Sequence, residues 1–335
     1  MYNRLQKYNK TYELFTNYLP NFILLEVYNS TNDFFSADPV VLTIGTFDGV
    51  HAGHLAVINV LRRKAQEIEG KTALLTFQPH PRVILHPGNH GLKLLNTMEE
   101  RMSLLEGAGL DFLIVQEFNL ELSRLTPLEY VKKLLTKGIK PSIIVIGDDH
   151  RFGRNRDGDF NALKEMGKIF GFEVIALDAE HINDIRVSST KIRDAIYNGD
   201  VDYASELLTQ NFSLSGEVVK GDQLGRGIGY PTANLQIEDD LKIIPANGAY
   251  AVWAQTQKGK KHMAMLNIGQ RPTVSDTSSI SIEVNLLDFD GDLYNQKLKI
   301  EFVKRIRDER KFSDIDELKS ALDSDEKFTR EILKS

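Results

Sequence analysis

Two histidines stand three residues apart in the segment GTFDGVHAGH (45–54), which links an apolar run to a helix-like stretch. A helix N-terminus offers free backbone N–H groups and the positive end of the helix dipole to a phosphate. Residues three apart share one face of a helix, so His51 and His54 could donate together to a triphosphate and stabilise a pyrophosphate leaving group. In the alternative, both histidines cap or support an ordinary turn. The accompanying candidates for binding ATP phosphates are Gly45, Phe47, Asp48 and Gly53.

A second polar segment, VSSTKIR (187–193), places three hydroxyls and a fixed positive charge at an expected helix start. Hydroxyls and free N–H groups at such a start bind phosphate oxygens, and a guanidinium forms strong charge-assisted hydrogen bonds with them. In the alternative, the segment is an ordinary Ser/Thr cap followed by a solvated arginine. The candidates are Ser188, Ser189 and Thr190 for phosphate binding and Arg193 for charge stabilisation.

The stretch GDQLGRGIGYPTAN (221–234) is rich in glycine and ends in the tetrapeptide PTAN. Glycines let a loop approach a phosphate closely, although glycine content alone is a weak signal. Thr232 and Asn234 are two residues apart, so in a strand both side chains face the same side, and their oxygens suit Mg²⁺. The chain contains no G-x-x-x-x-G-K-[ST] motif, which excludes a standard P-loop site.

A carboxylate, Glu283, lies near the start of the mostly apolar, strand-like run IEVNLLDF (282–289). A positioned carboxylate can act as a general base. In the alternative, Glu283 is an outward-facing residue on a half-exposed strand.

The chain has 41 Lys and Arg residues against 47 Asp and Glu residues, a formal charge of −6, and no cysteine. Nucleic-acid binders need clustered cations to neutralise phosphates, so this balance argues against that class. The lack of cysteine excludes a disulfide scaffold, a thiolate metal site and a cysteine nucleophile. No apolar run approaches the ~20 residues that span a bilayer, and the first residues lack the pattern of a secretory signal. We therefore expect a cytoplasmic protein without a membrane or nucleic-acid partner, and the sequence leaves open whether it forms a homo-oligomer.

The first two thirds of the chain alternate short apolar runs with helix-like stretches. The runs predict buried strands over 40–47, 72–77, 112–118, 142–148 and 172–178. Helical spacing predicts helices over 54–70, 98–109 and 127–139. This alternation predicts a parallel sheet with helices on both faces, whose ligands bind beyond the carboxyl ends of the strands.

From Phe212 the chain changes to strands separated by turns, which predicts an antiparallel barrel or sandwich. We expect a helix around 189–208 to join the two parts and a pair of helices over 314–335 to close the chain. The strands are expected over 214–219, 231–237, 248–256, 262–268, 281–289 and 296–306.

The H-x-G-H and VSSTKIR elements together resemble signature motifs of the adenylyl-transferring nucleotidyltransferases. TFQPHPRVIL (76–85) and VIGDDHRFGRNRDGD (145–159) are similar to one branch of them, the prokaryotic bifunctional riboflavin kinase/FAD synthetases. This chain has Gln78 where that family commonly has Asp, and His150 where it commonly has Phe. The later block resembles the riboflavin kinase barrel of the same family. Its elements are G-x-V-x-x-G-x-x-x-G-R-x-x-G-x-P-T-A-N (216–234), N-I-G-x-R-P-T (267–273), E-x-x-x-L-D-F (283–289) and R-x-E-x-x-F (307–312).

The resemblance implies an N-terminal extension of unknown role (1–22), a Rossmann-like FMN adenylyltransferase domain (23–186), a closing motif and linker helix (187–211) and a riboflavin kinase barrel with terminal helices (212–335). It implies that riboflavin and ATP give FMN, and that FMN and ATP then give FAD and pyrophosphate, with Mg²⁺ assisting.

The resemblance also implies the roles of individual residues. Glu283 would take the proton of the ribityl 5′-hydroxyl, and Thr232 and Asn234 would hold Mg²⁺. Asn285 stands where many members have His, and we expect no chemical consequence. The implied flavin and ATP contacts of the kinase are Gly221, Gly225, Arg226, Gly229, Arg307 and Glu309.

Three alternatives stay open at this point. If the departures at Gln78 and His150 disable adenylylation, the chain is a kinase with a vestigial or regulatory N-terminal domain. If neither pocket turns over ATP, the chain is a flavin sensor that controls a partner. A nucleotidyltransferase with another acceptor would share H-x-G-H but would not explain the kinase motifs.

Overall fold

The computed structural model describes residues 24–88, 91–147, 149–177, 187–221, 224–271 and 279–334. These residues form two compact units. Unit 1 takes the described residues among 1–46, 57–85 and 102–179, and unit 2 takes those among 47–56, 86–101 and 180–335. The expected extension, 1–22, lies outside the described residues. In the described part of the chain, no helix is long and apolar enough to cross a membrane.

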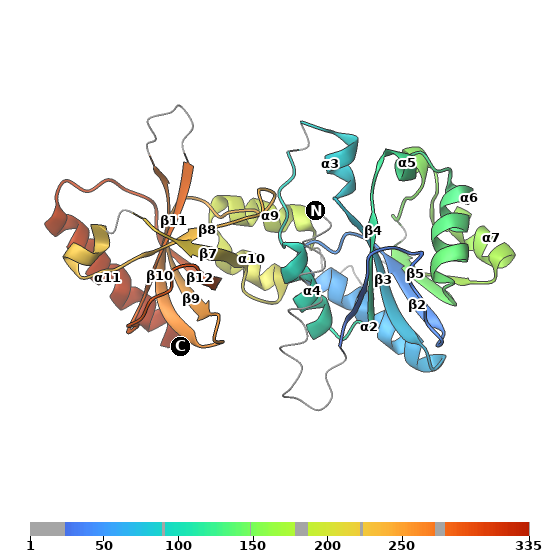
Figure 1. The fold of residues 1–335 in the computed structure, drawn as a ribbon, viewed down its shortest axis with the longest axis horizontal. Coiled ribbons are helices and arrows are strands. Elements are labelled where there is room, and N and C mark those ends of the chain that lie inside the picture. Colours follow the sequence, from blue (N-terminus) through green and yellow to red (C-terminus); the bar gives the residue numbers. More distant parts are fainter. Residues whose placement is uncertain are drawn as a thin grey trace. The chain divides into compact units, whose positions relative to one another are not determined.

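Unit 1 is built on a six-stranded parallel sheet in the order β1-β4-β3-β2-β5-β6 (Figure 1). The parallel α/β architecture expected from the sequence is confirmed. The five predicted strands are present as β2 (Val40–Ile44), β3 (Lys71–Gln78), β4 (Phe112–Glu117), β5 (Ile143–Gly147) and β6 (Glu173–Leu177). A further strand, β1 (Glu26–Tyr28), pairs with β4 and was not predicted.

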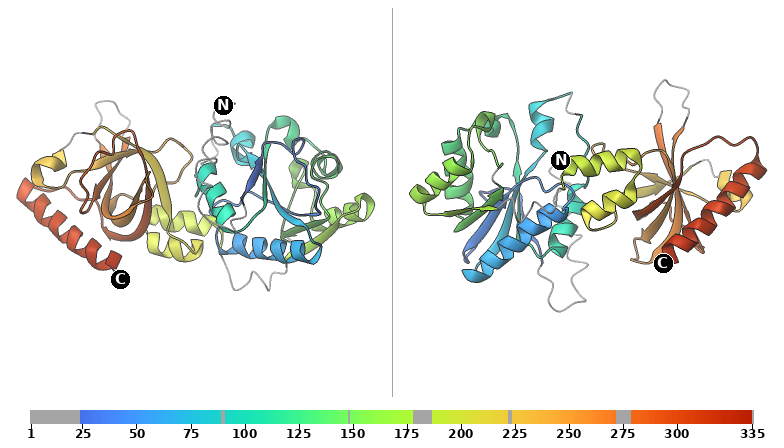
Figure 2. Two further views of the ribbon diagram at one scale, coloured as in Figure 1. Left: turned by 60° about the horizontal axis from the view of Figure 1, so that its bottom comes forward. Right: turned by 180° about the vertical axis from the view of Figure 1, so that it is seen from behind.

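Helices cover both faces of this sheet, because alternate residues of its central strands point to opposite sides and both sets are apolar. On one face, Leu42 of β2 belongs to a buried cluster with Leu134 and Leu163. On the other face, Val41 is buried, and Ile58 lies on the buried stripe of α2. Figures 1 and 2 show α2 (Ala52–Glu67) and α7 (Phe160–Phe170) on opposite sides of the sheet.

The helices of the first part differ from the prediction in two places. The helix expected over 127–139 starts as α6 (Pro127–Tyr130) and continues as a π-helix, η1 (Val131–Ile139). The helix α7 was not predicted, although Asp159 caps its start and Gly171 ends it in a left-handed conformation. The remaining helices are α3 (Pro81–Leu85), α4 (Met98–Gly107), α5 (Leu120–Ser123) and the short 3₁₀ turn η2 (Arg154–Arg156).

Unit 2 contains a closed antiparallel barrel in the order β10-β11-β8-β7-β12-β9. The barrel interior takes alternate residues of each strand, such as Tyr250, Val252 and Ala254, which are all buried. This confirms the expected barrel. Its strands are β7 (Ser213–Val219), β8 (Ala233–Gln236), β9 (Gly248–Thr256), β10 (Lys261–Arg271), β11 (Ser279–Leu286) and β12 (Lys297–Arg307), and η3 (Leu224–Ile228) precedes β8.

The helical segments of unit 2 correct two further expectations. The stretch 189–208 forms two helices, α9 (Ser189–Asn198) and α10 (Val201–Leu208), because Gly199 has a φ of 80° and ends α9. The expected closing pair is wrong: a single helix, α11 (Ile315–Lys334), runs along the barrel (Figure 2). No glycine or proline interrupts 315–334. In the middle of the helix, the Asp325 carboxylate accepts hydrogen bonds from Arg307 of β12.

Candidate functional sites

The turn between β2 and α2 has an unusual backbone conformation. Phe47 (φ 48°), Gly49 (φ 95°) and Val50 (φ 41°) all lie in the left-handed region. For the two non-glycine residues this costs about 1–3 kcal/mol each, so the surrounding structure must hold the turn in place. A Cβ at Gly49 would lie 2.7 Å from Cδ1 of Leu95, which makes glycine necessary there. Earlier in the segment, the Gly45 N–H donates to the carbonyl of Leu75 at 3.1 Å.

The turn directs the two histidines into one stack. The rings of His51 and His54 lie 3.7 Å apart between centroids, and the ring of Phe47 stacks on His54 at 4.4 Å. The Nδ1 atoms of both histidines are buried and have no hydrogen-bond partner among the described residues. Buried polar atoms normally have a partner, so this pair is suited to receive one from a ligand. A Cβ at Gly53 would lie only 3.3 Å from the His51 ring.

Burial keeps both imidazoles uncharged. It lowers the pKa of His51 to about 4, although the Asp48 carboxylate acts in the opposite direction. The pKa of His54 is also well below the ordinary value, because of its burial and the nearby His51 and Arg101. At neutral pH each ring is therefore neutral and offers an N–H donor rather than a positive charge.

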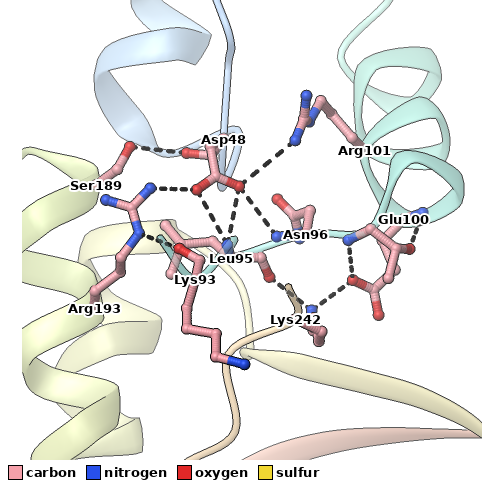
Figure 3. Close-up of polar contacts among 10 residues, drawn as sticks. Asp48, Lys93, Leu95, Asn96, Glu100, Arg101, Ser189, Arg193 and Lys242 are labelled. Atoms are coloured by element: carbon pink, nitrogen blue, oxygen red, sulfur yellow. Dashed lines mark hydrogen bonds and ion pairs between the residues drawn. The ribbon is translucent and has the colours of Figure 1, made fainter. Parts of the chain in front are cut away.

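The Asp48 carboxylate is the centre of a polar network within unit 2 (Figure 3). Its side chain is 2% exposed, and Oδ1 accepts hydrogen bonds from the N–H groups of Leu95 at 2.9 Å and Asn96 at 3.2 Å. Its Oδ2 lies 2.5 Å from Nη2 of Arg193, and the Arg101 guanidinium lies 3.7 Å from Oδ1. These partners occupy the carboxylate, so the predicted contact between Asp48 and a phosphate stays a prediction.

The segment VSSTKIR adds one more bond to this network. The Ser189 hydroxyl donates to the backbone carbonyl of Asp48 at 2.9 Å. Ser188 is the N-cap of α9, where its hydroxyl accepts a hydrogen bond from Lys191 N, so the capping alternative holds for this residue. Thr190 is exposed in the first turn of α9. The structure thus brings Arg193 and Ser189 to the Asp48 turn, and the phosphate contacts of Ser188, Ser189 and Thr190 stay predictions.

The two further segments of the adenylyltransferase resemblance lie in unit 1. Gln78 ends β3. The loop after β5 is closed by paired backbone bonds between Phe152 and Gly158, and a Cβ at Gly158 would lie 2.7 Å from the Phe152 ring. His150 stacks near Phe152 at 6.1 Å, its Nε2 is buried without a partner, and burial lowers its pKa to about 4. This loop is therefore an ordered structure that presents a neutral imidazole.

The proposed kinase residues come together on neighbouring strands of the barrel. Glu283 of β11 lies opposite Asn234 of β8 on one side and opposite Asn267 of β10 on the other. The Thr232 hydroxyl donates to Oε2 of Glu283 at 3.3 Å. The structure thus places Thr232, Asn234 and Glu283 side by side, and their roles in binding Mg²⁺ and in catalysis stay predictions.

The glycines before PTAN have structural reasons in addition to any contact with a ligand. A Cβ at Gly221 would lie 1.9 Å from Nδ2 of Asn234, and one at Gly225 would lie 2.1 Å from the Tyr230 carbonyl. Gly229 has a φ of 90°. The side chain of Arg226 lies outside the described residues, so its predicted ligand contact stays a prediction.

Two residues that support PTAN were missed by sequence reasoning. Asn285, for which we expected no consequence, is buried and donates from Nδ2 to the carbonyl of Pro231 at 2.7 Å. The Tyr230 hydroxyl lies 2.6 Å from Asp323 and 3.2 Å from Glu326 of α11. The polar side chain of Asn285 at an otherwise apolar strand position was an available signal for the first contact.

The C-terminal candidates are held by protein groups. The Arg307 guanidinium forks onto the buried Asp325 carboxylate at 2.8–3.1 Å and lies 5.4 Å from the Phe312 ring. Glu309 accepts from Nδ2 of Asn247 at 2.9 Å. Arg307 is therefore not a solvated turn residue, and the flavin contacts of Arg307 and Glu309 stay predictions.

Two segments of the chain match known protein families. Residues 35–191 match the family described as FAD synthetase, and residues 208–333 match the family described as riboflavin kinase. A bifunctional riboflavin kinase/FMN adenylyltransferase from Pseudomonas fluorescens is 36% identical over 285 residues, which cover 85% of this chain and 90% of that protein. This chain belongs to the bifunctional riboflavin kinase/FMN adenylyltransferase family.

Other members of this family and one solved structure are similar over most of the chain. The Escherichia coli K12 protein of the same name is 35% identical over 291 residues, which cover 87% of this chain and 92% of that protein. A crystal structure named as a macrolide-efflux protein from Streptococcus pneumoniae has a TM-score of 0.81 and 32% identity, and covers 92% of this chain and 99% of that chain. The similarity therefore extends across both functional segments.

Proposed function

We propose that this chain is a bifunctional enzyme of flavin nucleotide synthesis. It phosphorylates riboflavin with ATP to give FMN and adenylylates FMN with a second ATP to give FAD and pyrophosphate. The observation that carries this proposal is the coexistence of two sites in one chain, the Thr232–Glu283–Asn234 group and the stacked His51–His54 pair. Each site lies in the segment that matches the corresponding family. The efflux name of the similar crystal structure does not account for either group of residues.

In the first reaction, Glu283 accepts the proton of the ribityl 5′-hydroxyl. The hydroxyl oxygen then forms a bond to the γ-phosphorus of ATP as the bond to the β–γ bridging oxygen breaks, and ADP leaves. Phosphoryl transfer depends mostly on positioning and charge neutralisation. The Asn285 bond to Pro231 and the Thr232 bond to Glu283 supply the positioning that this chain's own residues can give.

Mg²⁺ is part of this proposal for the kinase site. The side-chain oxygens of Thr232 and Asn234 fit its preference for hard oxygen ligands. Among the described residues there is no group of three or more His, Asp or Glu side chains that could hold a metal. In phosphoryl-transfer sites Mg²⁺ commonly keeps several waters and binds largely through substrate phosphates. When bound, Mg²⁺ would neutralise charge on the ATP phosphates.

In the second reaction, an oxygen of the FMN phosphate forms a bond to the α-phosphorus of ATP. The bond to the α–β bridging oxygen breaks and pyrophosphate leaves, so no covalent enzyme intermediate is required. His51 and His54 donate hydrogen bonds to the phosphates, and the Arg193 charge stabilises the developing negative charge. The neutral state of both imidazoles leaves Arg193 as the cation of this group.

The test is a chromatographic time course with purified protein, riboflavin, ATP and Mg²⁺. We expect FMN first and FAD second, and no FMN when Mg²⁺ is removed with a chelator. His54→Ala should let FMN accumulate with FAD formation reduced by about 10²–10³-fold, the usual cost of removing one such donor. Replacing His262 on the barrel with Ala is the matched control and should leave FAD formation unchanged.

Each remaining alternative has its own result in this experiment. FMN that accumulates without FAD in the unmodified protein would indicate a kinase only and would direct attention to Gln78 and His150. Flavin binding without ATP consumption would indicate a sensor. A cytoplasmic location and any homo-oligomer are further proposals that fractionation and analytical ultracentrifugation would test.

A further inference from the structure

A lysine is buried in unit 2 next to the segment that bonds the Asp48 carboxylate. Lys242 is 2% exposed, and its Nζ lies 2.5 Å from Oε2 of Glu100 and 2.6 Å from the carbonyl of Leu95. The ammonium also lies 4.8 Å from the centroid of the Phe212 ring. Burying an ammonium is costly unless it is paired and hydrogen-bonded, so Lys242 depends on its contacts with Glu100 and Leu95.

Backbone bonds attach the same two segments to each other. The Leu94 N–H donates to the Leu241 carbonyl at 2.6 Å, and the Ile243 N–H donates to the Leu94 carbonyl at 2.9 Å. Lys242 stands between these two bonds and adds its side chain to the Leu95 carbonyl. Two backbone hydrogen bonds and the Lys242 side chain therefore hold the short segment 93–96 against 241–243.

The segment 93–96 in turn holds the Asp48–Arg193 pair. The Leu95 peptide accepts from Lys242 on its carbonyl side, and its N–H donates to Asp48 (Figure 3). The carbonyl of Lys93 accepts from Nε of Arg193 at 2.7 Å. Both protein anchors of the Arg193 guanidinium thus depend on 93–96, since one belongs to this segment and the other, Asp48, is held by it.

We propose that Lys242 is a positioning residue for FMN adenylylation. It touches none of the proposed phosphate-binding side chains and acts through segment 93–96 and Asp48 on Arg193. Lys242 lies in the segment that matches riboflavin kinase, whereas Leu95, Asp48 and Glu100 lie in the segment that matches FAD synthetase. A residue of the kinase segment therefore sets up the charge used in the other reaction. This inference rests on the proposed role of Arg193.

Two substitutions remove the buried contact from either side. Lys242→Met keeps the length of the side chain and deletes its charge. Glu100→Gln deletes the opposite charge but preserves the helix start of α4, where Thr97 N–H donates to Glu100 Oε2 at 3.0 Å and Glu100 N–H donates to the Thr97 hydroxyl at 3.2 Å. A glutamine can form the same capping box. If Lys242→Met fails to fold, Glu100→Gln still tests the proposal.

Lys297→Met is the matched control. Lys297 pairs at 3.1 Å with Glu99, the neighbour of Glu100, but both side chains are more than half exposed, at 63% and 54%. Exposed pairs of this kind contribute little to stability. This substitution removes the same charge from the same barrel and should leave both activities unchanged.

The measurement is steady-state kinetics of both reactions in each full-length variant. In Lys242→Met we expect kcat for FAD formation from supplied FMN to fall about 10- to 100-fold, the effect of misplacing a catalytic group by up to about 1 Å. KM for FMN should stay nearly constant, because Arg193 acts on charge that develops in the transition state. Riboflavin phosphorylation should stay within about twofold, since its residues make no contact with Lys242.

A double variant separates a positioning role from a general loss of stability. If Lys242 acts through Arg193, adding Lys242→Met to Arg193→Ala should cause no further loss of FAD formation, whereas independent effects would multiply. Multiplied effects would overturn the inference, as would wild-type FAD formation or equal loss of both activities in Lys242→Met and Glu100→Gln. Wild-type FAD formation in Arg193→Ala would instead overturn the proposed role of Arg193, and with it this inference.

Discussion

Asp48 and Arg193 are 145 residues apart in the sequence, yet Oδ2 of one lies 2.5 Å from Nη2 of the other. The same guanidinium donates from Nε to the carbonyl of Lys93 at 2.7 Å. A planar guanidinium can satisfy these two acceptors at once while its remaining N–H groups face elsewhere. The pair therefore fixes the orientation of Arg193 as well as its charge.

Replacing Arg193 with Lys tests whether orientation matters. Lysine keeps the charge but lacks the rigid fork, so it cannot bond Asp48 and the Lys93 carbonyl in the same geometry. We expect Arg193→Lys to lower kcat for FAD formation by about 10–10²-fold and to leave riboflavin phosphorylation unchanged. Arg330→Lys, which removes a fork on Asp288 at the surface of α11, is the control. Full FAD formation in Arg193→Lys would show that a charge alone is sufficient.

The buried imidazole of His51 predicts a pH dependence of stability. Its folded-state pKa, about 4, lies below the ordinary value of 6.5, so the unfolded chain binds this proton more readily. The contribution of a neutral His51 is therefore complete above pH 6.5 and is lost as the pH falls toward 4. The loss amounts to about 2 kcal/mol in the free energy of unfolding between pH 7 and pH 5.

Urea unfolding of the wild-type protein and His51→Gln at these two pH values measures this contribution. The variant should lose about 2 kcal/mol less than the wild type between pH 7 and pH 5, because glutamine binds no proton. Between pH 7.5 and 8.5, where His51 is neutral in both states, the two proteins should show the same pH dependence. Equal losses below pH 7 would mean that His51 is not buried as a neutral ring.

Asn285 predicts an effect on the kinase reaction alone. Its bond to the Pro231 carbonyl holds the start of PTAN, and losing it leaves a buried acceptor unpaired. We expect Asn285→Ala to lower kcat/KM for riboflavin phosphorylation about tenfold and Asn285→His, which keeps a donor, to retain more activity than Asn285→Ala. FAD formation from supplied FMN is the internal control. Equal activity of Asn285→Ala and the wild type would contradict this role and would mean that other contacts position PTAN.

The strands could be predicted from the sequence because they are short apolar runs bounded by turn residues. The strand β1 could not be predicted, because Glu26–Tyr28 has no apolar pattern and forms a strand only by pairing with β4. We expected two helices over 314–335, but Asp325 and Glu326 in the middle of the single helix α11 are held by Arg307 and Tyr230. Tertiary contacts thus determined what local propensity left open.

The grouping of Thr232, Asn234 and Glu283 was implied by the family resemblance, and spacing alone could not show that β8 pairs with β11. Residue types and spacing were also insufficient for the partners of those residues. A lysine in a sequence such as DDLKII is normally solvated. The burial of Lys242 depends on the carboxylate of Glu100, which is 142 residues away in the sequence. Such long-range pairs leave no periodic signal in the chain.

The fork between Arg307 and Asp325 yields a last prediction, on stability and on the C-terminal part of the kinase site. Asp325 is 5% exposed and accepts three hydrogen bonds from the one guanidinium. Asp325→Asn removes the charge and part of the fork, and the half-buried Arg307 then lacks its counterion. We expect the free energy of unfolding to fall by about 1–3 kcal/mol, measured by urea denaturation. Glu331→Gln, an exposed change in the same helix, should have little effect.

The same variant separates a purely structural Arg307 from one that also contacts flavin. If Asp325 orients Arg307 for ligand binding, KM for riboflavin should rise in Asp325→Asn while FAD formation from FMN stays constant. If Arg307 only ties α11 to β12, stability should fall and KM for riboflavin should stay the same. An unchanged free energy of unfolding would contradict both, because it would mean that this buried fork makes no net contribution.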